Sequence, residues 1–368
     1  MEISTAFNTP IAGSYDPADC LYLLKPIQPQ HVPIAEKERL IQSGCRHYSE
    51  MVTLEHPSDP RYVQLFLELT ERNRNRLAQD TLNLADAIRR TRTSPITLVS
   101  LARAGTPIGA LLQRALSRQL GVASRHYSIS IIRDRGIDER ALEYILRHER
   151  RPAEGITFID GWTAKGIITH ELKRSIACWN ARNTETLSDT LYVIADIGGS
   201  ADIAASNDDY VIPSGILGAA VSGLVSRSIL NEQIGAQDFH GCVVYQHLRF
   251  EDRSRWFLDT LCKTMARLIP QPLPTLDNAR RRTMIAAYID RVCNAYGISD
   301  INHIKPGVLE ASRVMLRRMP GLLLLRDPEC KDVAHLKLLA EEKSVPVEYD
   351  PDMPFNATAL IKDLRAAG

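Results

Sequence analysis

The chain has 368 residues and a mass of 41.2 kDa, which is the length of about two domains. Its contents of 44% hydrophobic and 24% charged residues are typical of a globular protein and exclude an intrinsically disordered one. The 45 basic and 44 acidic residues leave a formal charge of +1, which excludes a global field that draws the chain onto nucleic acid or anionic membranes.

No run of ~18 apolar residues occurs, and the first residues, MEISTAFNTP, lack the basic and apolar regions of a signal peptide. We therefore expect a cytoplasmic protein with no membrane partner. The cysteines are odd in number and form no CxxC pair, so we expect reduced thiols rather than a disulfide framework or a zinc site. They are Cys20, Cys45, Cys178, Cys242, Cys262, Cys293 and Cys330.

Residues 1–60 contain many proline and glycine breaks around short apolar runs, which predicts an irregular arm packed on a larger domain at 61–268. The first segment of that domain, 62–90, has apolar residues at helical spacing without glycine or proline, which predicts one long helix or two short ones. The run ITLVSLA at 96–102 predicts a strand, followed by a glycine turn and a helix that ends at Gly121.

This strand–turn–helix unit recurs, with strands predicted at 126–132, 156–161 and 191–199 and with helices between them. Such alternation is typical of α/β proteins and predicts a parallel sheet with helices on both faces. Ligands of such sheets bind at the carboxyl ends of the strands. The Pro-rich stretch IPQPLPTLDN then predicts a linker over 269–279.

A smaller α/β/α domain is expected at 280–368. Its predicted elements are helices at 280–296 and 306–318, a strand at 322–326, a helix at 333–343, a strand at 345–349 and a last helix at 357–365.

The segment ITFIDGWTAKGIITHEL at 156–172 leads from an apolar strand through a glycine-rich turn into a helix. A helix N-terminus offers free backbone N–H groups, glycines let a phosphate approach, and Thr163 and Lys165 add a hydroxyl and an ammonium group. Asp160 at the sheet edge could hold sugar hydroxyls or a magnesium ion. In the alternative reading, Asp160 only caps the turn and Lys165 is a solvated lysine.

Two further strand-end loops carry arginines. Arg103 precedes Ala104 and Gly105, and its guanidinium group can meet an anion with a forked contact. Arg133 and Arg135 belong either to a loop that closes over an anion or to a solvated charged loop. Three such loops on one sheet edge predict a polyphosphate ligand.

Together, LARAG with PIGALL, HYSISIIRDRGID and FIDGWTAKG resemble the type I phosphoribosyltransferase fold, and more narrowly the StiP-type phosphoribosyltransferases of bacterial tellurite-resistance and stress gene clusters. The resemblance implies that phosphoribosyl pyrophosphate and Mg²⁺ are used to ribosylate a small base-like acceptor, mainly through positioning and electrostatic stabilisation. It implies catalytic roles for Asp160, Arg103, Arg133 and Arg135. It implies binding of phosphoribosyl pyrophosphate by Ala102, Ala104, Gly105, Gly161, Trp162, Thr163, Ala164, Lys165 and Gly166.

The chain departs from that family at Gly161, which stands where the second acid of the loop is usual. Asp196 or Asp202 could supply the missing carboxylate, although Asp202 could equally cap a helix. The candidate metal ligands are therefore Asp160 and Asp196. The acceptor base is expected at a loop with a glycine and a hydroxyl, formed by Pro213, Ser214 and Gly215.

Two other functions stay open. Because half of the ribose clamp is missing, the chain could be a non-catalytic RNA-binding protein that senses a phosphoribosyl ligand. It could also be a cysteine hydrolase, because StiP-type chains are sometimes labelled cysteine proteases and Cys45 lies two residues before His47. A nucleophile and its base need proximity in space rather than in sequence, so we expect Cys45→Ser to be nearly silent.

The segment 304–349 resembles the Pelota-type RNA-binding superfamily, and residues 280–326 hold nine basic against three acidic residues. Leu309 stands where that family places a base-contacting Asn. We expect contact with RNA or the ribosome, or else a purely structural domain, and a homodimer as a further partner. The resemblance implies RNA-facing positions at Lys305, Gly307, Glu310, Arg313, Arg317 and Arg318.

Overall fold

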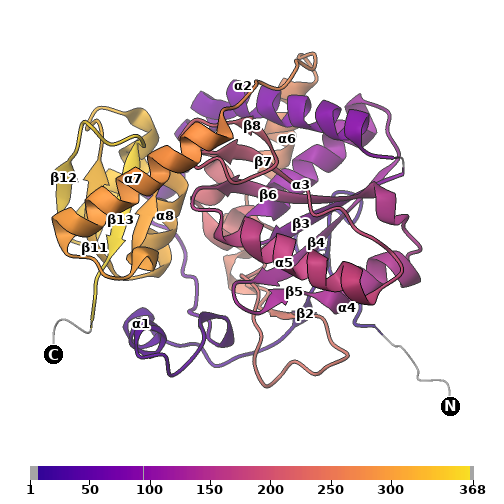
Figure 1. The fold of residues 1–368 in the computed structure, drawn as a ribbon, viewed down its shortest axis with the longest axis horizontal. Coiled ribbons are helices and arrows are strands. Elements are labelled where there is room, and N and C mark those ends of the chain that lie inside the picture. Colours follow the sequence, from indigo (N-terminus) through magenta and orange to yellow (C-terminus); the bar gives the residue numbers. More distant parts are fainter. Residues whose placement is uncertain (1–6, 94, 365–368) are drawn as a thin grey trace.

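The computed structural model describes residues 7–93 and 95–364. The chain forms a large and a small sheet, each covered by helices (Figure 1). The indigo N-terminal segment runs beneath both parts in the view of Figure 1.

The large sheet has the strand order β1-β4-β3-β6-β7-β8, and all of these neighbours are parallel. A short additional strand, β5, pairs antiparallel with β4. The predicted α/β fold with a mostly parallel sheet is therefore confirmed. The strands are β1 (Leu21–Leu23), β3 (Ile96–Ala102), β4 (Ser124–Ile132), β5 (Gly136–Ile137), β6 (Ile156–Thr163), β7 (Leu191–Asp196) and β8 (Ile203–Ser206).

Helices cover both faces of this sheet. On one face lie α2 (Pro60–Thr91) and α3 (Gly105–Arg114), with α6 (Ser254–Met265) packed on them, and on the other lie α4 (Glu139–Glu143) and α5 (Ile167–Arg182). Side chains of a strand alternate between faces, so Leu98 packs with the first group and Val99 with the second. The segment expected as one or two helices is the single helix α2, whose start Asp59 caps by accepting from the Arg61 amide at 2.7 Å.

The small sheet has the order β10-β13-β11-β12. Its strands are β10 (Ile304–Pro306), β11 (Pro320–Leu325), β12 (Val347–Tyr349) and β13 (Ala357–Ile361). The helix α7 (Asn278–Tyr296) covers one face, and α8 (Val308–Arg317) and α9 (Ala334–Glu342) cover the other. Accordingly Leu324 packs against α7, whereas Leu323 and Leu325 face α8 and α9.

The predicted helix at 357–365 is wrong, because Ala357–Ile361 forms the strand β13 inside the small sheet. All five of its residues are buried, and the strand pairs antiparallel with β10 and with β11. A short apolar run that is buried on both faces has no periodicity that separates a strand from a helix. Arg365, the last residue of that predicted helix, lies outside the described part of the chain.

The N-terminal arm contains the helix α1 (Ile34–Gln42), and β1 is an edge strand of the large sheet. Another arm strand, β2 (Lys25–Pro26), pairs with β9 (Gly241–Cys242). Through α1 the arm contacts the small domain as well as the large one, as the ion pair of Glu38 with Arg318 shows. Shorter helical turns lie at Tyr48–Glu50, Ala115–Gln119, Tyr144–His148, Ala153–Gly155, Pro213–Gly215, Gly218–Val221, Gln246–Glu251, Ile301–His303 and Lys331–Val333.

Candidate functional site

A cavity of about 880 Å³ lies between the carboxyl ends of β3, β4 and β6, the N-terminal arm and the helix α8 of the small domain. Ten basic and six acidic side chains line it, so the local charge is positive although the whole chain is nearly neutral. The cavity sits at the sheet edge where α/β proteins bind ligands.

Most of the residues predicted as functional from the sequence come together here. Those that line the cavity are Ala102, Arg103, Ala104, Arg133, Asp160, Trp162, Thr163, Ala164, Lys165, Gly166, Ser214, Gly215, Lys305, Glu310, Arg313, Arg317 and Arg318. Those outside its lining are Gly105, Arg135, Gly161, Asp196, Pro213 and Gly307.

Arg103 follows β3 and is 93% buried. Its Nη1 lies 2.8 Å from Glu55 Oε1 and donates to the Val225 carbonyl at 3.2 Å, while its Nη2 is buried without a hydrogen-bond partner in the described residues. Burial by itself raises the pKa of Glu55, but Arg103, Arg317 and the Ala219 amide lower it to about 2. Glu55 is therefore an anion at neutral pH.

Asp160 lies in the buried part of β6, and its Oδ1 accepts from the Gly161 amide at 2.7 Å. Burial raises the pKa of Asp160 to about 6, although Arg313 and the Gly161 amide lower it. The guanidinium carbon of Arg313 lies 4.5 Å from the centre of the Trp162 ring. Asp160 is therefore a carboxyl group poised to titrate near neutral pH, inside the cavity lining.

The side chain of Lys165 points away from the strand ends of the large sheet and toward the small domain. Its Nζ donates to the carbonyls of Ile301 at 2.6 Å and Ile304 at 2.9 Å, both in the small domain. Burial lowers the pKa of this ammonium group to about 7. The glycine turn after β6 thus holds the small domain through Lys165.

The two arginines of the third predicted loop, Arg133 and Arg135, lie in different environments. Arg133 lines the cavity, and its Nη1 donates to Asn302 Oδ1 at 3.4 Å. Arg135 instead donates to Glu50 Oε1 at 2.6 Å, outside the cavity lining. Only Arg133 of this pair is placed to meet a ligand there.

The carboxylates do not fit the expected magnesium site. Asp196 accepts from the amides of Gly198 at 3.1 Å and Ala201 at 2.7 Å, so its oxygens are occupied by backbone. Asp202 pairs with Lys173 Nζ at 2.9 Å. In residues 7–93 and 95–364, no group of three or more His, Cys, Asp or Glu side chains could hold a metal ion.

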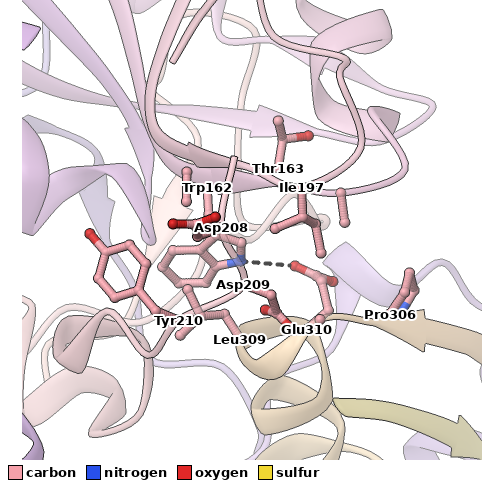
Figure 2. A pocket seen from close by; sticks show the side chains of 12 residues that line it. Trp162, Thr163, Ile197, Asp208, Asp209, Tyr210, Pro306, Leu309 and Glu310 are labelled. Carbon is pink, nitrogen blue, oxygen red and sulfur yellow. Dashed lines mark hydrogen bonds between the residues drawn. The ribbon is translucent and has the colours of Figure 1, made fainter. Parts of the chain in front are cut away.

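Tight packing joins the two domains beside the cavity. Figure 2 shows the indole of Trp162, whose Nε1 donates to Glu310 Oε1 of α8 at 3.2 Å. A Cβ on Gly215 would lie 2.7 Å from Leu309 Cδ2 and 2.9 Å from the Trp162 ring, so a larger residue there would force one of these side chains to shift. Ser214 beside it has a buried hydroxyl without a hydrogen-bond partner in the described residues.

The predicted RNA-facing residues form the other wall of this cavity rather than an outer surface. Arg318 pairs with Glu38 of α1 at 2.5 Å, and Arg317 lies 4.0 Å from Glu55. Gly307 packs against Ile197, outside the cavity lining. This side of α8 therefore faces the large domain.

Among the charged residues of the cavity that the sequence analysis missed are Lys37, Glu55 and Arg227. Lys37 and Glu55 come from segments of the arm without a motif, and only the packing of distant segments brings them and Arg227 into one cavity. The sequence offered only isolated charged residues in these segments, and isolated charged residues are common on the surface of any protein.

No described cysteine lines the cavity. Cys45 and Cys178 are exposed, and Cys45 lies in a segment whose neighbours on either side, Gln42 and Tyr48, do line it. Close to it, His47 contacts Ser49 Oγ through Nδ1 at 2.8 Å, and its buried Nε2 has no hydrogen-bond partner in the described residues. Burial and the guanidinium groups of Arg135 and Arg133 lower the pKa of His47. The imidazole is therefore neutral at pH 7.

Two family models match the chain. Residues 13–262 match the tellurite-like stress resistance cysteine protease StiP, and residues 283–363 match the PELOTA RNA binding domain. A curated protein of Acinetobacter baylyi (strain ATCC 33305 / BD413 / ADP1), named cysteine protease StiP, is 39% identical over 369 residues, covering 96% of this chain and 94% of that protein.

Two solved structures of hypoxanthine phosphoribosyltransferase from Trypanosoma cruzi also match. The first, a 1.4 Å crystal structure, is 18% identical with a TM-score of 0.28, and covers 39% of this chain and 82% of that one. The second, a complex with the product IMP, is 15% identical with a TM-score of 0.27, and covers 51% and 93%.

The prediction of a phosphoribosyltransferase that uses phosphoribosyl pyrophosphate is wrong, because the family model and the curated relative both name a cysteine protease. Glycine turns and arginines at strand ends accommodate anions on many α/β scaffolds, and a fold does not determine a reaction. In residues 7–93 and 95–364, no helix is long and apolar enough to cross a membrane.

Proposed function

Because this chain belongs to the StiP family of tellurite-like stress resistance cysteine proteases, we propose that it is a cysteine-dependent hydrolase that cleaves peptide bonds. The observation that carries the proposal is the 39% identity to the curated cysteine protease over nearly the whole length of both chains. Identity of that extent makes a shared reaction the best-supported function for this protein.

Cys45 is the best candidate for the nucleophile. A reactive cysteine needs access to its substrate and a thiolate form, whereas burial in apolar surroundings makes a thiol inert. Cys20 and Cys242 are buried, and burial raises the pKa of both. Of the two exposed cysteines, Cys178 lies on the outer helix α5, and only Cys45 has cavity-lining residues on both sides of it in the chain.

His47 is the candidate general base. In the tautomer that donates Nδ1–H to Ser49 Oγ, the neutral imidazole has a free lone pair on Nε2. In this proposal Nε2 takes the proton of the Cys45 thiol, and the sulfur attacks the peptide carbonyl carbon. His47 returns the proton to the leaving amine, and water then hydrolyses the thioester and restores the thiol. This assignment replaces our expectation that Cys45 has no chemical role.

The test compares two exposed cysteines. Cys45→Ala should abolish the hydrolysis of fluorescein-labelled casein, and Cys178→Ala should leave its rate unchanged. His47→Gln should lower kcat and remove the acidic limb of the pH–rate profile, which a merely structural histidine would not do. Mass spectrometry after brief exposure to iodoacetamide should find Cys45 modified first.

Two outcomes would contradict the assignment. Full activity in Cys45→Ala would move the nucleophile to another cysteine. Full activity in a chain in which all seven cysteines are replaced would remove the hydrolase function altogether.

RNA binding by the small domain is a second candidate function, favoured by the match of residues 283–363 to the PELOTA model. Since Lys305, Arg317 and Arg318 face the cavity, RNA would have to use the exposed side of α7, where Arg280 and Arg282 lie, or separate the domains. The full chain should bind a structured RNA hairpin more weakly as salt rises, and Arg280→Gln with Arg282→Gln should reduce the salt slope by about two. Absence of binding at low salt would contradict this candidate.

For the large sheet we propose the type I phosphoribosyltransferase-like arrangement as an architecture only. Its support is the run of parallel strands with glycine turns at their carboxyl ends. Likewise we propose a Pelota-like arrangement for the small α/β/α domain, supported by the family match. Neither proposal assigns a reaction.

A further inference from the structure

Arg227 lines the cavity, and only one of its two terminal amino groups donates a hydrogen bond within the described residues. Its Nη2 donates to the carbonyls of Tyr48 at 2.5 Å and of Met51, and its charge lies 5.4 Å from the centre of the Tyr48 ring. Its Nη1 is buried and has no hydrogen-bond partner in the described residues. A fixed arginine thus presents a donor group that nothing in the described part of the chain accepts.

Two neighbours share this property. Arg103 is 93% buried and Ser228 is 96% buried, and the Nη2 of the first and the hydroxyl of the second lack partners among the described residues. Arg103 also donates to the carbonyl of Val225, three residues before Ser228, so both lie on the same stretch of wall. Buried donors without acceptors are costly and rare in folded proteins. Three of them on one wall of the cavity indicate a missing acceptor.

The positive charge of this wall indicates that the missing acceptor is an anion. Lys37 and Arg317 join Arg103 and Arg227 in this wall, and the acid Glu55 contacts Arg103 and Arg317. Lys37 donates to Thr53 Oγ1 at 2.9 Å instead of to an acid. Burial and the surrounding guanidinium groups lower the pKa of Lys37 to about 7 and that of Arg317 to about 9. Other charged groups nearby, such as Arg318 with Glu38, are already paired.

We propose that this cavity binds a small phosphorylated ligand, whose phosphate group is held by Arg227, Arg103 and Ser228 beside Lys37 and Arg317. The ligand site is separate from the proposed hydrolase chemistry and needs neither Cys45 nor His47. A volume of about 880 Å³ is in the range of small-molecule sites.

A phosphate suits the wall better than a carboxylate does. The unpartnered atoms are two guanidinium amino groups and one hydroxyl. A phosphate offers three terminal oxygens and up to two negative charges, whereas a carboxylate offers two oxygens and one charge. Arginine forks match phosphate oxygens in pairs. The ligand would also join the two domains, since Arg317 belongs to α8 and Arg103 to the end of β3.

Isothermal titration of the full chain at low salt tests the proposal with inorganic phosphate, adenosine 5′-monophosphate and adenosine. Both phosphates should bind and adenosine should not. Tighter binding of the nucleotide than of phosphate identifies a phosphomonoester ligand, and equal binding identifies phosphate itself. Arg227→Gln should weaken either by at least tenfold, and Arg227→Lys should recover part of the affinity because it keeps the charge.

The matched control is Arg267→Gln, which removes an exposed arginine at the end of α6 and should bind like the wild type. Circular dichroism of each variant verifies folding. Cys45→Ala should bind phosphate unchanged, which separates this site from the hydrolase function. The proposal is overturned by absence of phosphate and nucleotide binding at millimolar concentration, or by unchanged affinity in a folded Arg227→Gln.

Discussion

Glu55, in the arm between α1 and α2, lies 2.8 Å from Nη1 of Arg103 at the end of β3. The second oxygen of the same carboxylate accepts from the Ala219 amide at 2.8 Å, and Arg317 of α8 approaches at 4.0 Å. One acidic side chain thus joins the arm, the large sheet and the small domain. Because it opposes several cations around one cavity, its charge bears on stability as well as on the site.

Glu55→Gln should destabilise the protein at neutral pH. The pKa of Glu55 is about 2 in the folded chain, below its unfolded value, so its stabilising effect is present above about pH 4.5 and is lost as pH falls toward 2. The difference corresponds to about 3 kcal/mol in the free energy of unfolding. Urea unfolding of wild type and variant between pH 7 and pH 3 checks this, with the exposed Glu232→Gln as control. Equal pH dependence of Glu55→Gln and wild type would contradict it.

Lys165→Met should change how stability depends on alkaline pH. The pKa of Lys165 is lowered to about 7, so between pH 7 and 10 the unfolded chain binds a proton that the folded chain has released. Stability therefore rises with pH in this window, and the variant should lose up to about 1.4 kcal/mol per pH unit of that slope. The exposed Lys263→Met is the control. A variant with the wild-type slope in denaturant unfolding would show that Lys165 is not the group responsible.

Arg318→Ala should destabilise the contact between α1 and α8. Its partner Glu38 is fully buried, with a contact of 2.5 Å, and the variant leaves this carboxylate without its cation. Breaking such a pair costs about 3–5 kcal/mol, whereas replacing both partners costs much less. Thermal and urea unfolding should therefore show recovery in Glu38→Gln with Arg318→Met. Additive losses in the double variant would mean that the two side chains do not interact.

Gly215→Ala should weaken the packing between the domains. The added Cβ would meet Leu309 at 2.7 Å and Trp162 at 2.9 Å, and such overpacking costs about 1–3 kcal/mol. Gly235→Ala is the control, because its nearest neighbour, Asp238 Oδ2, would lie 3.4 Å away. Leu309→Val should recover part of the lost stability, because the shorter side chain leaves more room for the added Cβ. Equal melting temperatures for both glycine variants would contradict the close packing.

The sequence alone determined the four central strands of the large sheet, β3, β4, β6 and β7, and the glycine turns beside them, but not β1, β5 or β8. A run such as Ile96–Ala102 is apolar, rich in β-branched residues and followed by Gly105, so its strand and turn follow from neighbouring residues. Once these units alternate with helices, a parallel sheet with its turns at one edge is nearly obligatory. For that reason local patterns were sufficient to place the loops of Arg103, Arg133 and Asp160 together. The reaction could not be placed in this way, because anion-friendly loops serve many chemistries.

Only the tertiary structure decided what closes that edge. The strand β13 has a five-residue apolar pattern that suits a helix equally well, and its pairing with β10 and β11 selects the strand. Glu55 and Lys37 stand in segments without a motif, and Arg227 and Arg317 line the cavity only through the packing of segments far apart in the chain. Periodicity and turn chemistry act over a few residues, whereas these contacts join segments far apart in the chain. The burial and charge of the cavity therefore arise from long-range packing that no local pattern contains.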